Sequence, residues 1–193
     1  MRTAMIRVAL VLVAGLVAAG CAVEVAGTPS PAPAAVGRPD SAAFSDASGR
    51  FSLVPPPGWS VDTSGTQDTA VIFADPLPVG SAGGRFRANI NVIVLPAGAD
   101  LPTTVASARQ ELTGLPHYRP TADEGITLAD GSRAQLLGGT FDDPGSGLAL
   151  RNVQLLSVHA GATVVVTGTT LAGEWAGHGG VLESSLRSLT VIG

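Results

Sequence analysis

From Gly49 onward the chain is a series of short apolar runs separated by turn residues. The clearest run is residues 88–95, where Asn89 and Asn91 point to one face of an extended chain and aliphatic residues point to the other. The same reasoning predicts further strands at residues 51–54, 59–62, 70–74, 126–128, 134–141, 148–159 and 162–170. Residues 80–84 predict the turn before the clearest strand.

Two segments have helical spacing instead. Asp100 is a capping residue, Pro102 suits a first helical turn, and the predicted helix ends near Gly114. A second helix is predicted over residues 174–189, with glycines that weaken its first half. Its expected buried stripe comprises Trp175, Leu182, Leu186 and Leu189. The fold class is therefore α+β, with one domain over residues 49–193 in which helices flank an antiparallel β-sheet.

A different pattern occupies the N-terminus. Two arginines precede an apolar run over residues 8–19, which is too short to span a bilayer. Small residues then stand directly before a cysteine, as in a bacterial lipoprotein signal. We therefore predict a signal peptide over residues 1–20 whose cleavage box is Ala18, Ala19 and Gly20, followed by lipidation of Cys21.

Cys21 is the only cysteine, so it cannot form an internal disulfide, and lipidation gives it a role. A diacylglyceryl group on Cys21, with palmitate-like acyl chains, anchors the mature chain to the outer face of the cell membrane. The alternatives are an uncleaved anchor and a plain secretory signal with an incidental cysteine.

Residues 21–48 are rich in Ala, Pro, Gly and Ser, so they bury too little apolar surface to fold and are predicted to be a disordered tether. In the alternative, Phe44 and its neighbours form a short element packed on the domain.

Charge excludes one class of partner. The formal net charge is −4, lysine is absent, and the eleven arginines form no basic stripe, so nucleic acid is not an expected partner. The usage of Arg, Ala, Gly and Val suggests a high-GC genome.

The order of these elements resembles a known family. The strings FSLVPPPGW, VIVLP, HAGATVVV and LESSLRSLTV follow the N-terminal signal in the order found in the LpqN/LpqT-type lipoproteins of mycobacteria and their relatives. The resemblance implies a PsbP-like α/β/α sandwich and places Trp59 and Leu186 in the core. It also implies a non-enzymatic accessory protein that works with envelope lipids or with the membrane proteins that transport them.

No catalytic, metal or cofactor motif stands out. The histidines are His117, His159 and His178, without paired metal-ligand spacing, and no Gly-x-Ser-x-Gly elbow occurs. Ser146 lies in a loop-like string after Asp142 and Asp143, which we interpret as a solvated turn. Because serine, histidine and aspartate are all present, a small extracytoplasmic hydrolase acting on envelope esters is the alternative function.

Two features are candidates for ligand binding. Arg85 and Arg87 could meet an anionic head group or an acidic partner, or could be solvated charges at a strand edge. Trp175 and His178 lie in the glycine-rich start of the last helix, where loose packing could open a groove for an acyl chain. The alternative there is a frayed helix start with Trp175 in the core.

Overall fold

The computed structural model describes residues 42–81, 84–159 and 161–192. The predicted signal peptide, Cys21 and most of the predicted tether lie outside the described residues.

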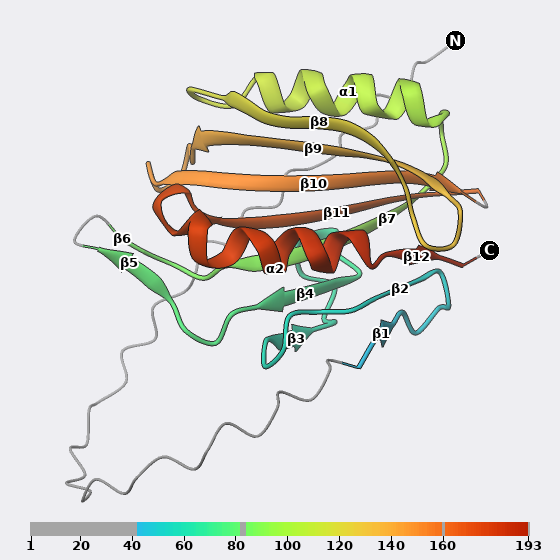
Figure 1. The fold of residues 1–193 in the computed structure, drawn as a ribbon, viewed down its shortest axis with the longest axis horizontal. Coiled ribbons are helices and arrows are strands. Elements are labelled where there is room, and N and C mark those ends of the chain that lie inside the picture. Colours follow the sequence, from blue (N-terminus) through green and yellow to red (C-terminus); the bar gives the residue numbers. More distant parts are fainter. Residues whose placement is uncertain (1–41, 82–83, 160, 193) are drawn as a thin grey trace, which may run out of the picture.

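A seven-stranded antiparallel sheet forms the centre of the domain (Figure 1). Long strands with alternating or continuous apolar residues occupy its middle, and shorter or more polar strands occupy its edges. In spatial order the strands are β3 (Ser60–Asp62), β4 (Val71–Ala74), β7 (Asn89–Pro96), β11 (Ala162–Leu171), β10 (Ala149–His159), β9 (Arg133–Asp142) and β8 (Arg119–Thr127).

The two predicted helices are present. The carboxylate of Asp100 caps α1 (Leu101–Thr113) by accepting a 3.0 Å hydrogen bond from the Thr103 amide. A short 3₁₀ turn, η2 (Ala172–Glu174), leads into α2 (Trp175–Arg187). Within the residues that the structure describes, no helix is long and apolar enough to cross a membrane.

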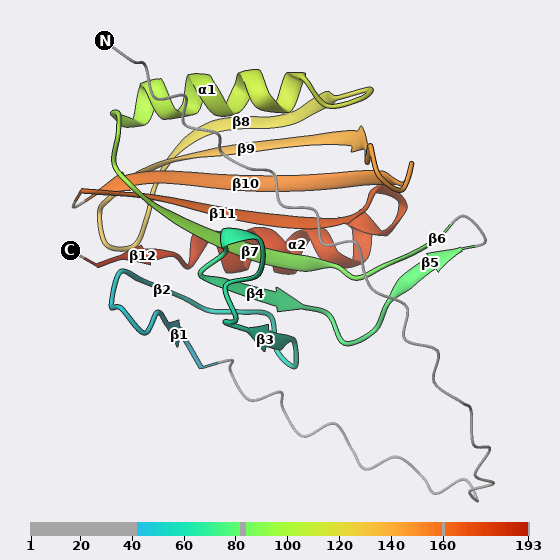
Figure 2. The same cartoon turned by 180° about the vertical axis from the view of Figure 1, so that it is seen from behind.

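The helices cover opposite faces of the sheet. Leu155 and Val166 are cross-strand partners in the cluster that contains α2, whereas the next pair, Leu156 and Val165, belongs to the cluster that contains α1. Accordingly, α2 lies in front of the sheet in Figure 1 and behind it in Figure 2. The predicted α+β class, with helices on both faces of an antiparallel sheet, is confirmed.

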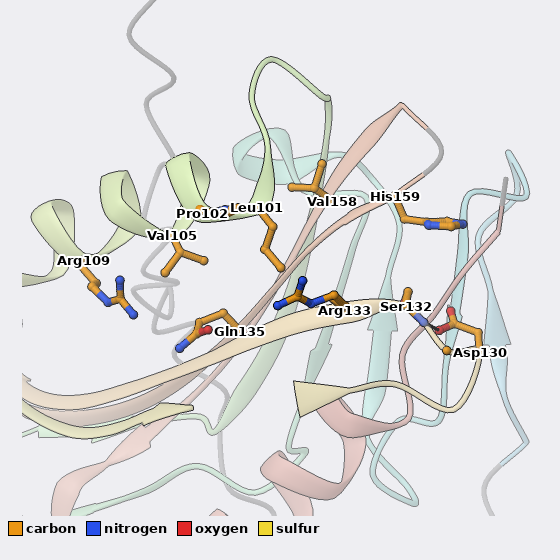
Figure 3. Close-up of a pocket in the computed structure, with 11 residues that line it drawn as sticks. Leu101, Pro102, Val105, Arg109, Asp130, Ser132, Arg133, Gln135, Val158 and His159 are labelled. Atoms are coloured by element: carbon orange, nitrogen blue, oxygen red, sulfur yellow. Dashed lines mark hydrogen bonds between the residues drawn. The ribbon is translucent and has the colours of Figure 1, made fainter. Parts of the chain in front are cut away.

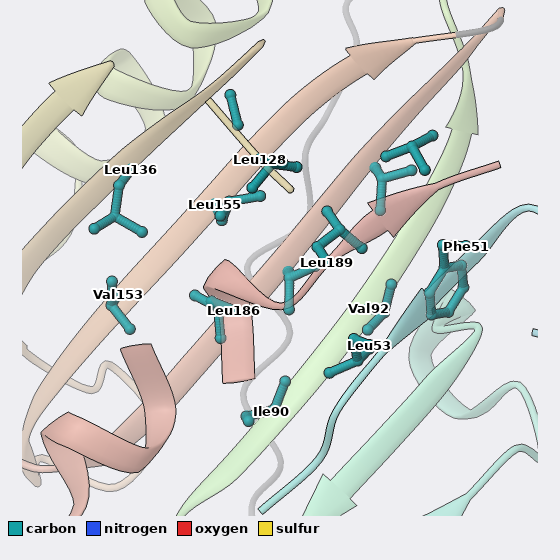
Figure 4. Close-up of a cluster of buried hydrophobic side chains, with 14 of the residues drawn as sticks. Phe51, Leu53, Ile90, Val92, Leu128, Leu136, Val153, Leu155, Leu186 and Leu189 are labelled. Carbon is teal, nitrogen blue, oxygen red and sulfur yellow. The ribbon is translucent and has the colours of Figure 1, made fainter. Parts of the chain in front are cut away.

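The larger hydrophobic core lies between α2 and the sheet (Figure 4). Leu182, Leu186 and Leu189 are fully buried there, against aliphatic residues of the central strands. At about 25 cal/mol per Å² of apolar surface removed from water, this layer is the main source of stability. The prediction that Leu186 belongs to the core is confirmed.

The face under α1 is different. A smaller cluster joins Ala108 and Leu112 of α1 to three aliphatic residues of the sheet. Farther along the same face, buried polar side chains replace aliphatic ones. These are Asn89, Asn91, Asn152, Gln154, Thr167 and Thr169.

A second, three-stranded sheet closes the end of the α2 layer. It joins β1 (Phe44–Ser45), β2 (Phe51–Leu53) and β12 (Thr190–Val191), so both ends of the domain meet. The Phe44 ring packs edge-on against Phe73, with the centroids 5.3 Å apart. The alternative in which Phe44 forms a short packed element is therefore correct, and the predicted limit of the tether at residue 48 is wrong.

Three further details differ from the prediction. The turn predicted at residues 80–84 is part of a hairpin of β5 (Val79–Ser81) and β6 (Gly84–Phe86), and a 3₁₀ turn, η1 (Thr66–Asp68), precedes β4. Trp59 is only half-buried and packs at the margin of the main core, because β3 is an edge strand with an exposed neighbour, Val61.

Strand β8 is longer than the predicted residues 126–128, because its charged residues give no apolar alternation from which a strand could be predicted.

Two ion pairs attach this edge strand to the helices. Arg109 of α1 pairs with Asp123, and Arg187 of α2 pairs with the next residue, Glu124. Because successive strand residues point to opposite faces, each helix binds β8 from its own side.

Candidate functional site

A cavity of about 680 Å³ lies between the start of α1 and the sheet (Figure 3). Leu101, Pro102 and Val105 of α1 and Val158 of β10 form its apolar wall. The polar wall comes from β9, the end of β10 and the turn between β8 and β9. Leu101 is at the first turn of α1, so the Asp100 cap that fixes this helix end also fixes the apolar wall.

One cation of the cavity is already neutralised. The Arg109 guanidinium donates two 2.8 Å hydrogen bonds to the two carboxylate oxygens of Asp123. These bonds raise the pKa of Arg109 and hold the pKa of Asp123 below its usual value. Gln135, which also lines the cavity, donates a further hydrogen bond to Asp123.

Asp130 is the carboxylate that lines the cavity. Its two oxygens accept hydrogen bonds from the backbone N–H groups of Ser132 and Val191, at 2.8 and 2.9 Å. Partial burial raises the pKa of Asp130, but these hydrogen bonds and the nearby His159 outweigh burial and lower it. The carboxylate therefore fixes the β8–β9 turn and strand β12 in place.

Arg133 differs from Arg109. It is exposed at the cavity, and its guanidinium makes no ion pair or hydrogen bond within the described part of the chain. In Figure 3 it lies between Arg109 and His159, below the apolar side chains of α1. The cavity thus joins an unpaired cation to an aliphatic wall.

The cavity also brings together Ser132, His159 and Asp130, the residue types of a hydrolase triad. However, no hydrogen bond joins Ser132 to His159, and Asp130 is engaged with the backbone. A nucleophile activated by a base needs such a bond. The arrangement therefore does not form a catalytic triad.

The other histidines lack a serine partner as well. His117 Nδ1 lies 2.7 Å from Asp142, and His178 Nε2 lies 3.3 Å from Asp75. Ser146 donates its hydroxyl to Asp143 within a turn, in agreement with the interpretation of this string as a turn. Among residues 42–192, apart from the omitted positions, no group of three His, Cys, Asp or Glu side chains could hold a metal ion.

Arg85 and Arg87 flank a buried phenylalanine. Phe86 packs with Phe141 and Leu150, so the arginines before and after it project from the opposite side of the strand. Both arginines are exposed, and neither forms an ion pair with another described residue. Their predicted role in binding an anionic group remains a prediction.

Trp175 and His178 both lie in the first turn of α2, where a groove between helix and sheet was expected, but the space at Gly179 is filled. A Cβ atom on Gly179 would lie 2.5 Å from the Trp175 indole. The same indole stacks under the Arg151 guanidinium, whose carbon lies 4.0 Å from a ring centroid. The expected loose packing at Gly179 is therefore wrong, because the glycine is the space into which Trp175 fits.

Sequence reasoning missed the cavity between α1 and the sheet. Its lining residues come from three stretches of the sequence, 101–109, 130–135 and 158–159, and only His159 of these is among the candidate residues named from the sequence. A useful signal was present in Arg133, a cation that ends a polar turn and begins a mostly apolar strand.

No family model matches this chain, and no curated protein sequence matches it. Among solved structures, LpqN, "involved in cell envelope biogenesis of Mycobacterium tuberculosis", has a TM-score of 0.57 and 17% identity, and the match covers 79% of this chain and 90% of LpqN. The cyanobacterial PsbP of Synechocystis has a TM-score of 0.55 and 15% identity, with 84% of this chain and 99% of that chain covered.

A third match lies outside bacteria. The Ran-binding protein Mog1p of Saccharomyces cerevisiae has a TM-score of 0.50 and 16% identity, with 78% of this chain and 94% of that chain covered. At such identities the likeness shows the fold alone. The chain therefore has a single-domain, PsbP-like α+β fold, shared with LpqN.

Proposed function

We propose that this protein is a non-catalytic binding or adapter module of the bacterial cell envelope, of the LpqN type. It is held on the outer face of the membrane by a diacylglyceryl group on Cys21 and works with envelope lipids or with the membrane proteins that transport them. The observation that supports this most is the fold match to LpqN over 90% of that chain, together with the lipoprotein pattern that ends at Cys21.

Two features of the domain favour binding over catalysis. The described histidines lack a hydrogen-bonded serine, whereas the cavity under α1 is large and partly apolar and is lined by the unpaired Arg133. Such a cavity is typical of a ligand site.

The anchor is tested by replacing Cys21 with serine in the full chain, expressed in a bacterial host that lipidates exported proteins. Diacylglyceryl transfer requires the thiolate, so Cys21→Ser removes the lipid. We expect the wild-type protein to enter the detergent phase after phase separation and to incorporate a labelled acyl chain. We expect the Cys21→Ser protein to do neither. Equal acyl labelling of both proteins would contradict the proposal.

Binding is tested separately by native mass spectrometry of the protein extracted from membranes. A co-purifying lipid or membrane protein supports the module. Turnover of an acyl ester that disappears in His159→Ala would instead support the alternative hydrolase.

A further inference from the structure

We infer that the cavity under α1 binds an amphiphile, a molecule whose anionic phosphate or carboxylate group contacts Arg133 and whose short apolar segment lies against Leu101, Val105 and Val158. This inference deepens the binding role proposed above, but it is independent of the anchor at Cys21.

The charges around the cavity favour an anion. Arg109 is neutralised by Asp123, and Asp130 already accepts two backbone hydrogen bonds. Arg133 is the cation at the cavity that no described carboxylate neutralises. A phosphate or carboxylate oxygen accepts well from a guanidinium, whose donors are arranged for bidentate contact.

The shape of the cavity favours an attached apolar segment. The aliphatic wall formed by α1 and Val158 has no polar group that could bind a bare ion, and such an ion is better solvated in water. Each methylene that moves from water onto such a wall contributes favourably to binding. The polar and apolar walls face each other across one space of about 680 Å³, which is larger than a ten-carbon chain with a phosphate group needs.

The test uses residues 21–193 carrying Cys21→Ser, which include every described helix and strand and need no detergent. Calorimetric titration compares decyl phosphate, decanoate, inorganic phosphate and decanol, each below its micelle concentration. We expect decyl phosphate and decanoate to bind with one-to-one stoichiometry, and phosphate and decanol each to bind at least about tenfold more weakly.

Two variants locate the site. Arg133→Gln removes the unpaired cation from an exposed position, and we expect it to weaken decyl phosphate binding by about tenfold or more. Val158→Trp fills the apolar side of the cavity, and we expect it to weaken decyl phosphate and decanoate alike. Arg119→Gln, which changes an exposed arginine of β8 outside the cavity, is the matched control and should leave binding unchanged.

The inference is overturned if Arg133→Gln binds decyl phosphate as the wild type does, or if decanol binds as tightly as decyl phosphate. Equal affinity for inorganic phosphate would reduce the cavity to an anion site and also overturn the inference. The titrated protein carries no lipid, so these titrations do not depend on the result of the Cys21 experiment. The two proposals can therefore fail separately.

Discussion

The two faces of the central sheet are built from the same strands but packed in different ways. On the α2 face, three fully buried leucines lie against a continuous aliphatic surface. On the α1 face, the aliphatic cluster is small, amide and hydroxyl side chains are buried beside it, and a cavity remains. Successive residues of a strand point to opposite faces of the sheet, so residues on one face can be substituted without altering the packing of the other. One face of such a sheet can therefore supply stability while the other supplies a binding site.

The largest effect should come from removing a side chain from the α2 face. Leu186→Ala is expected to destabilise the domain by about 2–5 kcal/mol, since the surrounding core cannot collapse into the space. Val105→Ala, at the wall of the cavity, should cost less, about 1–2 kcal/mol, because it removes two buried carbons and the space left joins an existing cavity. Urea unfolding of both variants measures the comparison, and equal losses would mean that the α1 face is as closely packed as the other.

An intermediate effect is expected at the start of α2, where two neighbouring glycines differ. A Cβ on Gly179 would collide with the Trp175 indole, whereas a Cβ on Gly180 meets nothing within 4 Å. Gly179→Ala should therefore destabilise the domain by about 1–3 kcal/mol and shift tryptophan fluorescence. Gly180→Ala should stabilise it by about 0.5–1 kcal/mol, because alanine has less backbone freedom to lose.

Thermal and urea unfolding of this glycine pair decides whether the α2 face is closed at that end. A Gly179→Ala protein as stable as the Gly180→Ala protein would restore the possibility of a groove beside Trp175.

The smallest effect concerns the rim of the cavity and depends on pH. Hydrogen bonds lower the pKa of Asp130 in the folded state, so the folded protein binds this proton less readily than the unfolded chain. The stability from Asp130 is thus present above the unfolded pKa of about 4 and is lost as the pH falls through the lower folded value. Asp130→Asn should be less stable than wild type at neutral pH and equally stable in acid.

Urea unfolding across the acidic range measures this difference, with Asp68→Asn as the control at an exposed carboxylate. A gap between wild type and Asp130→Asn that stays constant with pH would show that the ionised carboxylate is not what fixes the turn.

Much of the fold was predictable because the informative patterns are local. Asp100 and Pro102 gave the start of α1 within a residue, and continuous aliphatic runs gave β10 and β11. The prediction was poorest where tertiary contacts decide. Phe44 is held by strand pairing with β2 and by ring contacts with Phe73, and β8 is held by its pairing with β9 and by the ion pairs of its acids with Arg109 and Arg187.

The candidate site was much less predictable than the fold. Arg133 and Val105 are 28 positions apart in the sequence and face one cavity only after α1 packs on β9 and β10. The loose packing expected at Gly179 was wrong because helical glycines indicate missing side chains but not what fills the space. Trp175, four residues earlier on the same helix, occupies it.

The paired charges on β8 have a further consequence for molecules crowded together on a surface. An exposed sheet edge invites a second copy to add its own strand, and such self-association is the first step towards aggregates. Strand β8 resists it with a proline at position 120, a register shift between Pro120 and Ala122, and acids at 123 and 124 that the helices hold in place. The opposite edge, β3, is only three residues long. Many copies could therefore stand side by side without joining their sheets.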